Sequence, residues 1–170
     1  MVKFGGKYLM TIRSESGDFR MYHAVSADGL NWDDFTPWRW DDGSIIETEN
    51  TQQHWLKHGN RLYLVYTRKS DLSQGVFRAR APLWMAEVDT QSLRLIRSSE
   101  KIVFPAKNAR MGNFCVANVT ENESWVMVGE WVEGMFPDKH KGMRFFVENN
   151  PDINYIQYIG DLLLARIYWE

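Results

Sequence analysis

Short runs in which apolar and polar residues alternate, or in which β-branched and aromatic residues dominate, recur along the chain. Each run is bounded by Gly, Asn, Asp or Ser, and they lie at residues 7–13, 19–26, 61–68, 81–89, 93–104, 113–120, 124–131 and 161–169. Runs of this length and composition predict strands. No window of comparable length has the apolar spacing of an amphipathic helix. The pattern therefore predicts an all-β fold.

The predicted strands form a repeated unit. Middle strands that each follow a turn align when Gly6, Asn60 and Glu123 are placed at the same position. In the second and third units a preceding strand enters that turn, at residues 52–60 and 112–123, and an outer segment such as 93–104 ends the second unit. A strand repeat of roughly 40 to 60 residues predicts blades of antiparallel sheet in a β-propeller.

The number of blades predicts an incomplete ring. The first unit has no preceding strand in this interpretation, because Met1 lies directly before the turn that leads into residues 7–13. A closed propeller has at least four blades, whereas the chain supplies about two to three. We therefore expect residues 1–170 to form a single partial β-propeller domain. It is either the C-terminal portion of a longer propeller or part of a homo-oligomer, because an open ring exposes sheet edges.

Composition narrows the classes of partner. A formal net charge of -2 argues against a broad nucleic-acid footprint and a polybasic membrane surface. Neither a signal peptide nor a bilayer-spanning run is recognisable, so a soluble chain is expected. The single Cys115 excludes an internal disulfide, and with four histidines it predicts no zinc cluster; no cofactor is expected. The eight tryptophans suit a β-rich core or a carbohydrate site.

One turn has a more specific pattern, "SADGLNW" at residues 26–32. The Asp28 carboxylate can accept hydrogen bonds from backbone N–H groups of the turn, and Gly29 can supply a positive φ. Trp32 is then expected to fold back onto the blade. The equivalent stretch of the second unit is "EVDTQSL" at residues 87–93, so the full latch is not expected to repeat.

This turn resembles the Asp-box of sialidases and other BNR-repeat proteins, although it is one residue shorter than the usual Ser-x-Asp-x-Gly-x-x-Trp. Further similarity lies in "TQQHWL", "LVYTRK", "FRARAPLWMAEVD", "ARMGNF" and "ESWVMVGEW". Together these stretches are similar to the C-terminal half of bacterial sialidase-like proteins. The resemblance covers nearly the whole chain. It implies a glycoside hydrolase of the exo-sialidase type that acts on terminal, acidic sugars of a glycan, in a parent protein exported to the periplasm or beyond.

Polar residues occupy positions where a structural inner strand prefers Val or Ile. "TQQHW" carries Gln52, Gln53 and His54, and "RMGNF" carries Arg110 and Asn113. We predict that Gln53 and Asn113 bind substrate. His54 is predicted to be an acid/base or a hydrogen-bond donor to a sugar hydroxyl, and the alternative is a packed histidine beside Trp55.

Arginine, tyrosine and glutamate complete the predicted site. Sialidases clamp the substrate carboxylate with three arginines, and the resemblance implies that Arg68, Arg80 and Arg110 form such a set; the alternative is ordinary ion pairs. Tyr66 shares a strand face with Arg68, which could lower the pKa of the phenol. The resemblance implies a tyrosine nucleophile at Tyr66 assisted by Glu130, and the alternative for Tyr66 is a place in the core.

Three function classes follow. A hydrolase needs two carboxyl groups at the channel mouth, a polysaccharide lyase needs His54 and Tyr66 to converge there, and a non-catalytic carbohydrate-binding or structural piece needs neither. The family's acid/base aspartate lies before the part represented here, so we expect the isolated chain to be inactive. Asp41 and Asp42, flanked by tryptophans, are a sugar platform or a capped turn. Residues 134–158 depart from the strand pattern and suit a lid or specificity loop.

Overall fold

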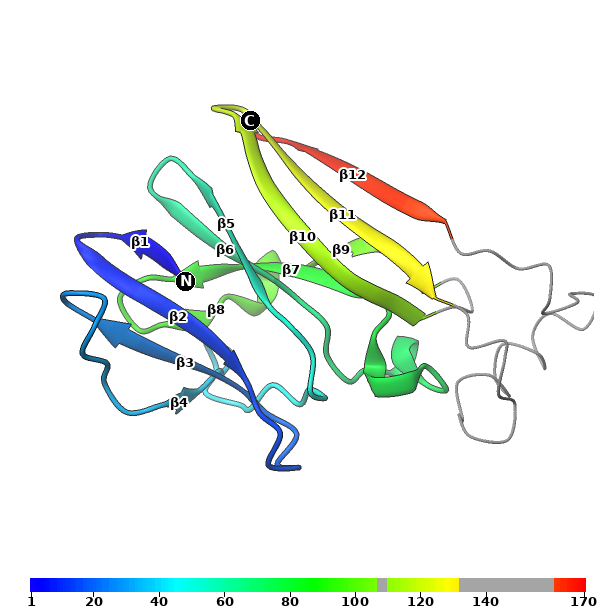
Figure 1. The fold of residues 1–170 in the computed structure, drawn as a ribbon, viewed down its shortest axis with the longest axis horizontal. Coiled ribbons are helices and arrows are strands. Elements are labelled where there is room, and N and C mark those ends of the chain that lie inside the picture. The colour runs from blue at the N-terminus through cyan, green and yellow to red at the C-terminus, as the bar shows by residue number, and fades with distance from the viewer. Residues whose placement is uncertain (107–109, 132–160) are drawn as a thin grey trace, which may run out of the picture.

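The computed structural model describes residues 1–106, 110–131 and 161–170, and the described chain forms three antiparallel sheets side by side (Figure 1). The first sheet, blade 1, holds β1 (Val2–Phe4), β2 (Lys7–Arg13), β3 (Met21–Ser26) and β4 (Thr36–Pro37). Blade 2 holds β5 (His54–His58), β6 (Arg61–Tyr66), β7 (Leu83–Asp89), β8 (Arg94–Leu95) and β9 (Lys101–Phe104). Blade 3 holds β10 (Arg110–Thr120), β11 (Glu123–Trp131) and β12 (Leu162–Tyr168).

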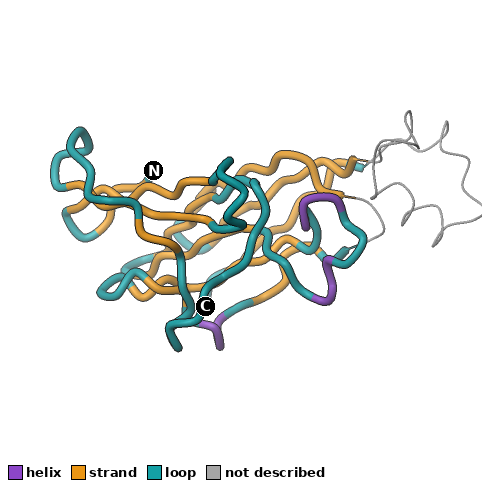
Figure 2. Tube along the Cα trace, turned by 90° about the horizontal axis from the view of Figure 1, so that it is seen from below, coloured by secondary structure: helices purple, strands orange, loops and turns teal. Residues whose placement is uncertain are grey.

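The helical segments in the described ranges are three short 3-10 turns, and Figure 2 shows how little of the trace they occupy. They are η1 (Asp71–Ser73), η2 (Phe77–Ala79) and η3 (Arg97–Ser99). The all-β prediction is therefore confirmed, as is the partial propeller with blades of antiparallel sheet. Within each blade, consecutive strands pair with one another, except that β9 pairs with β7 and not with β8.

Blade 2 lies between the other two, and the burial of β6 shows this directly. Successive side chains on a strand point to opposite faces of the sheet. Leu62, Leu64 and Tyr66 belong to the apolar cluster shared with blade 1. Tyr63 and Val65 belong to the cluster shared with blade 3. Both faces of β6 are thus buried, which explains why its sequence is apolar throughout instead of alternating.

The residues that the structure describes cover only one of the two faces of blade 3. Val126 and Val128 on β11 are fully buried against blade 2, while Trp125 and Met127 between them are more than a third exposed. The burial of β11 therefore alternates although its residues 125–128 are all apolar.

Three details of the repeat differ from the sequence interpretation. The first unit does have a preceding strand, because β1 pairs with β2. The outer segment of the second unit is two short strands, β8 and β9, separated by η3. The middle strands start at Lys7, Arg61 and Glu123, so the third unit was aligned one residue out of register. A shift of one residue exchanges the two faces of a strand, so the counterpart of Leu9 and Tyr63 in blade 3 is Trp125 and not Val126.

The turn after β3 has the predicted latch geometry. The Asp28 carboxylate accepts hydrogen bonds from the backbone N–H groups of Leu30 and Asn31, both at 2.8 Å. These bonds hold the pKa of Asp28 well below its usual range. Gly29 has a φ of +81°, in the left-handed region. Trp32 is half-buried, as expected for a side chain that folds back.

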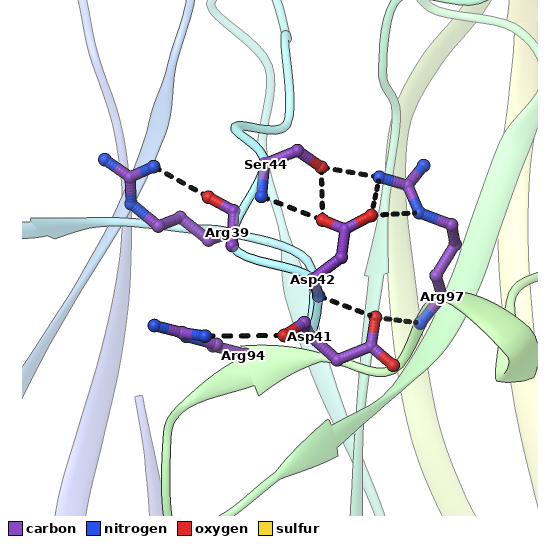
Figure 3. Close-up of polar contacts among 7 residues, drawn as sticks. Arg39, Asp41, Asp42, Ser44, Arg94 and Arg97 are labelled. Atoms are coloured by element: carbon purple, nitrogen blue, oxygen red, sulfur yellow. Dashed lines mark hydrogen bonds and ion pairs between the residues drawn. The ribbon is translucent and has the colours of Figure 1, made fainter.

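Blades 1 and 2 are also joined at their outer edge by the charged cluster in Figure 3. Asp42 accepts hydrogen bonds from the backbone N–H of Ser44 at 2.8 Å and from the Arg97 guanidinium at 3.0 Å. Next to this contact, Trp40 forms an isolated parallel bridge with Leu95. The Asp41 backbone carbonyl accepts a hydrogen bond from Arg94. Asp41 and Asp42 therefore form the capped turn that was the alternative to a sugar platform. The same contacts fasten the outer strand of blade 2 to blade 1.

Candidate functional site

The predicted site residues of blades 2 and 3 lie at one common end of their sheets. Cross-strand pairs show this: His54 at the start of β5 pairs with Val65 near the end of β6, and Met111 at the start of β10 pairs with Glu130 near the end of β11. In Figure 1 this end is the lower one, where β5 and β10 begin. We call it the polar edge, and it comprises Gln52, His54, Arg80, Arg110, Asn113 and Glu130.

The residues that lead into β5 alternate between the two neighbouring blades. Gln52 Nε2 donates a hydrogen bond of 2.6 Å to the Phe114 carbonyl of blade 3. Gln53 points the other way and accepts a hydrogen bond of 2.7 Å from Thr11 Oγ1 of blade 1. Two adjacent glutamines therefore tie blade 2 to both of its neighbours.

Gln53 has both ends of its amide occupied within the protein. Its Oε1 accepts from Thr11, and its Nε2 donates to the Thr51 carbonyl at 2.5 Å. The residue is also buried. The structure thus gives Gln53 a role in the seam between blades 1 and 2, and its contact with substrate stays a prediction.

His54 faces blade 3 and is half-buried. Its ring meets the Phe114 ring edge-on, with 4.9 Å between centroids. Burial lowers the pKa of the imidazole, and the positive charge of the N-terminal amine acts in the same direction. A neutral imidazole at pH 7 can donate from one ring nitrogen and accept at the other, which suits a sugar hydroxyl.

A β-bulge at the start of β10 presents Asn113. Met111 pairs with Glu130 and Phe114 with Val128, so β10 carries one residue more than β11 between these pairs. A Cβ on Gly112 would lie 3.2 Å from the Gly129 carbonyl oxygen, a tight contact that a glycine avoids. Asn113 is exposed. Bulges commonly redirect side chains next to active sites, and the glycine of "RMGNF" is the signal that the sequence analysis missed.

Arg80 and Arg110 come close together on the blade 3 side of the polar edge. The Met111 backbone N–H donates a hydrogen bond of 3.2 Å to the Arg80 carbonyl, which places η2 alongside β10. The Arg110 guanidinium lies over the Phe77 ring, 4.8 Å from its centroid. Glu130 lies across the strand pair and donates its backbone N–H to the Asp161 carbonyl at 2.8 Å.

Tyr66 and Arg68 form a separate cluster, on the face of blade 2 that meets blade 1. Both bind Glu100, a residue that the sequence analysis did not select. The Tyr66 hydroxyl donates to Glu100 at 2.6 Å, and Arg68 makes a bidentate pair with the same carboxylate at 2.8 and 2.7 Å. The Arg68 guanidinium also lies 4.5 Å from the Trp84 ring centroid.

This arrangement corrects the expected chemistry of Tyr66. Burial raises the pKa of the phenol well above its ordinary value, and the neighbouring Glu100 charge raises it further; these effects outweigh the lowering by Arg68. Arg68 does lower the pKa of Tyr66, as the shared strand face predicted, but burial and Glu100 outweigh its effect. The alternative, that Tyr66 belongs to the core, is confirmed by its complete burial.

The structure therefore brings together one part of the predicted site and separates another. His54 and Glu130 lie on the facing surfaces of the seam between blades 2 and 3, with Arg80, Arg110 and Asn113 at the same end. Tyr66 lies on the opposite face of blade 2 from His54. The convergence of His54 and Tyr66 that a lyase would need is not present.

Other candidate features lie elsewhere. A pocket of about 380 Å³ is lined by Met10, Trp32, Asp33, Asp34 and Phe35 on blade 1, away from the polar edge. Within the described ranges, His, Cys, Asp and Glu side chains form no group of three that could hold a metal ion. In the same part of the chain, no helix is long and apolar enough to cross a membrane. The stretch 134–158, predicted to be a lid, lies outside the described residues.

Comparison with known proteins identifies the fold. No protein-family model and no curated protein matches the chain. Among solved structures it is similar to a GH43_12 protein retrieved from a capybara gut metagenome, with a TM-score of 0.52, 12% identity, and coverage of 74% of this chain and 23% of the other. It is also similar to a bifunctional GH43-CE protein of Bacteroides eggerthii, with a TM-score of 0.52, 10% identity, and coverage of 78% and 16%.

Both structural relatives are glycoside hydrolases of the GH43 type, and neither is a sialidase by its description. The chain spans less than a quarter of the length of each of them. At these identities the likeness concerns the fold.

Proposed function

We propose that the chain is part of a carbohydrate-active protein of the glycoside hydrolase type, and that its polar edge forms one wall of the sugar site. The observation that carries the proposal is the placement of His54, Arg110, Asn113 and Glu130 at one end of blades 2 and 3, at the starts of β5 and β10 and the end of β11. The fold that these strands share with two GH43 proteins supports the same class.

Each group has a role that its chemistry suits. Asn113 is exposed on its bulge and offers both a donor and an acceptor to sugar hydroxyls. His54, whose pKa is lowered by burial, exchanges hydrogen bonds with the sugar as a neutral imidazole. Glu130 is the candidate for one of the two carboxyl groups that most glycosidases use.

The finer proposal concerns an acidic sugar, as a sialidase-like substrate would be. The backbone of Arg80 is hydrogen-bonded to Met111, next to Arg110, so the two arginines are neighbours, and guanidinium groups match the geometry of a carboxylate. Arg68 is committed to Glu100 by two hydrogen bonds, so the proposed clamp consists of Arg80 and Arg110. A nucleophilic role for Tyr66 remains a prediction that requires its release from Glu100.

A non-catalytic carbohydrate-binding role is the second candidate. It is favoured by the separation of Tyr66 from His54 and by the presence of Glu130 as the one carboxyl group that we assign to the polar edge. Both candidates bind a glycan, so turnover is the measurement that distinguishes them. Only the hydrolase requires Glu130 for chemistry.

Isothermal titration of the folded chain with sialyl, uronic-acid and neutral oligosaccharides tests the proposal. We expect measurable affinity for an acidic glycan that Asn113→Ala and His54→Ala each weaken about tenfold, the effect of losing roughly one hydrogen bond. Asn60→Ala, at an exposed asparagine at the other end of blade 2, is the matched control. Absence of binding to every glycan at millimolar concentration, with folding intact, would contradict the proposal.

A further inference from the structure

Phe19 lies at the same end of the molecule as the polar edge, in the loop between β2 and β3. Its backbone carbonyl accepts a hydrogen bond of 2.9 Å from the Thr48 N–H, in the segment that leads into β5. In Figure 1 this loop and the start of β5 both lie at the lower end. Thr48 precedes His54 by six residues, at most about 20 Å of extended chain. Phe19 is therefore within reach of an oligosaccharide bound at the polar edge.

The backbone of Phe19 is strained. Its φ is +56°, in the left-handed region that bulky residues seldom adopt. The hydrogen bond to Thr48 holds the loop on one side. On the other side the Asp18 carboxylate accepts hydrogen bonds from the Arg20 backbone N–H at 3.3 Å and from the Tyr22 hydroxyl. Strain of this kind persists only where the surroundings impose it, and it collects at functional sites.

Burial in the core does not account for the strain, because Phe19 is 48% exposed. The Lys69 ammonium lies over the ring, 3.6 Å from its centroid, and pairs with the Glu49 carboxylate at 3.2 Å. The side chains of this ion pair are 34% and 26% exposed. The accessible ring surface is thus bordered by a donor and an acceptor whose charges cancel.

The corresponding loop of blade 2 is strained as well. Arg78 and Ala79 have φ values of +53° and +46°, and they directly precede Arg80 of the polar edge. In the described chain the other non-glycine residue with a positive φ besides these and Phe19 is Leu93, in the hairpin between β7 and β8. Strained residues are therefore concentrated in the loops at the end where the glycan is proposed to bind.

We propose that Phe19, together with Lys69 and Glu49, forms a second subsite for the glycan held at the polar edge, and that this subsite takes an uncharged sugar residue. An aromatic ring packs against the apolar C–H face of a sugar, and the ammonium and carboxylate beside it donate to and accept from the hydroxyl groups. An acidic residue gains little here, because Glu49 already balances the charge of Lys69.

This inference rests on glycan binding at the polar edge and adds the kind of glycan. The ligand is an oligosaccharide, with its acidic residue at the arginines of the polar edge and a neutral residue of the same chain at Phe19.

Isothermal titration with two ligands tests the subsite: free sialic acid, and a sialylated pentasaccharide whose other residues are neutral. The unchanged chain should bind the pentasaccharide about tenfold more tightly than the monosaccharide. Phe19→Asn should abolish this gain without changing the affinity for sialic acid, and Phe19→Tyr, which keeps a ring, should retain it. Phe35→Asn is the matched control, because Phe35 is an exposed phenylalanine in another turn of blade 1.

Thermal melts separate binding from a structural role. Asn adopts the left-handed region more readily than Phe, so the melting midpoint of Phe19→Asn should not fall. A clearly lower midpoint would show that the ring holds the fold, and would overturn the subsite. An equal gain for the pentasaccharide in Phe19→Asn and in the unchanged chain would overturn the subsite alone and leave the polar edge standing. Absence of binding to both ligands would contradict the proposed function, and this inference with it.

Discussion

Thr11 of blade 1 donates a hydrogen bond from its Oγ1 to Gln53 Oε1 of blade 2 at 2.7 Å. Thr11 lies in the middle of β2, and Gln53 lies immediately before β5. Because Gln52 reaches the opposite way to Phe114, the residues preceding His54 are fixed on both sides. The position of His54 at the polar edge thus depends on contacts with both neighbouring blades.

Replacing Gln53 tests this seam. Gln53→Ala removes the acceptor for Thr11 and the donor to Thr51, both in a buried environment. The free energy of unfolding should fall by about 1–3 kcal/mol, the cost of leaving buried polar groups without partners. Chemical denaturation measures this change. Gln74→Ala, at an exposed glutamine beside η1, should change stability by less than about 0.5 kcal/mol, and an equal effect of both would refute the seam's contribution.

Glu100 should matter more for stability than Glu87, an acid whose arginine partner is exposed. Glu100→Gln removes the charge that Arg68 and Tyr66 share in a largely shielded site, so we expect a loss of about 2–4 kcal/mol. Glu87→Gln breaks the pair with Arg61, whose side chain is 58% exposed, and should cost less than about 1 kcal/mol. Denaturation of the two variants in parallel measures the difference. Comparable losses would mean that the Glu100 cluster is solvated in solution.

Histidine burial predicts a dependence of stability on pH. Burial lowers the pKa of His23, and it lowers the pKa of His54 as well. As pH falls below about 6.5, the unfolded chain takes up protons at these positions before the folded chain does, so stability should decrease. Above that pH both states are neutral at these groups and the contribution is constant.

The control for this effect keeps the packing of His23. The His23 ring lies 4.6 Å from the Trp38 ring centroid, so His23→Phe retains an aromatic contact while removing the titrating group. Thermal melts between pH 7.5 and 5.0 should show a shallower loss of stability in this variant. An unchanged pH profile would mean that His23 titrates normally in the folded state.

Gly112 links the shape of the bulge to ligand binding. Gly112→Ala places a Cβ 3.2 Å from the Gly129 carbonyl, so β10 must shift and Asn113 with it. We expect a destabilisation of about 1 kcal/mol and weaker glycan binding. Gly129→Ala is a matched control, because a Cβ at Gly129 meets nothing within 4 Å. Glycan titration of both variants measures the effect, and equal affinities would contradict a role for the bulge.

The sequence predicted the strands well because their burial follows a two-residue period. The alignment of the third unit was one residue out of register because Glu123 can be read as the last turn residue or as the first residue of the strand. Each choice gives an apolar alternation, since Trp125 and Met127 are apolar as well as Val126 and Val128. Only packing against blade 2 distinguishes the two faces.

Part of the candidate site could also be predicted from the strand repeat. The placement of His54, Arg110 and Asn113 at strand starts follows from the repeat, and the structure places them at one end. Glu100 could not be selected, because it reaches Tyr66 and Arg68 from a segment more than 30 residues away. The Gln53 side chain points toward blade 1. A polar residue at an inner-strand position does not by itself determine that direction.

Binding of a glycan at the polar edge can be measured by an amide-resolved NMR titration of the folded chain with a sialylated oligosaccharide. We expect saturable shifts concentrated on the backbone amides of His54, Arg110, Met111 and Asn113. Shifts confined to the blade 1 pocket around Trp32, or no saturable shift at all, would contradict it.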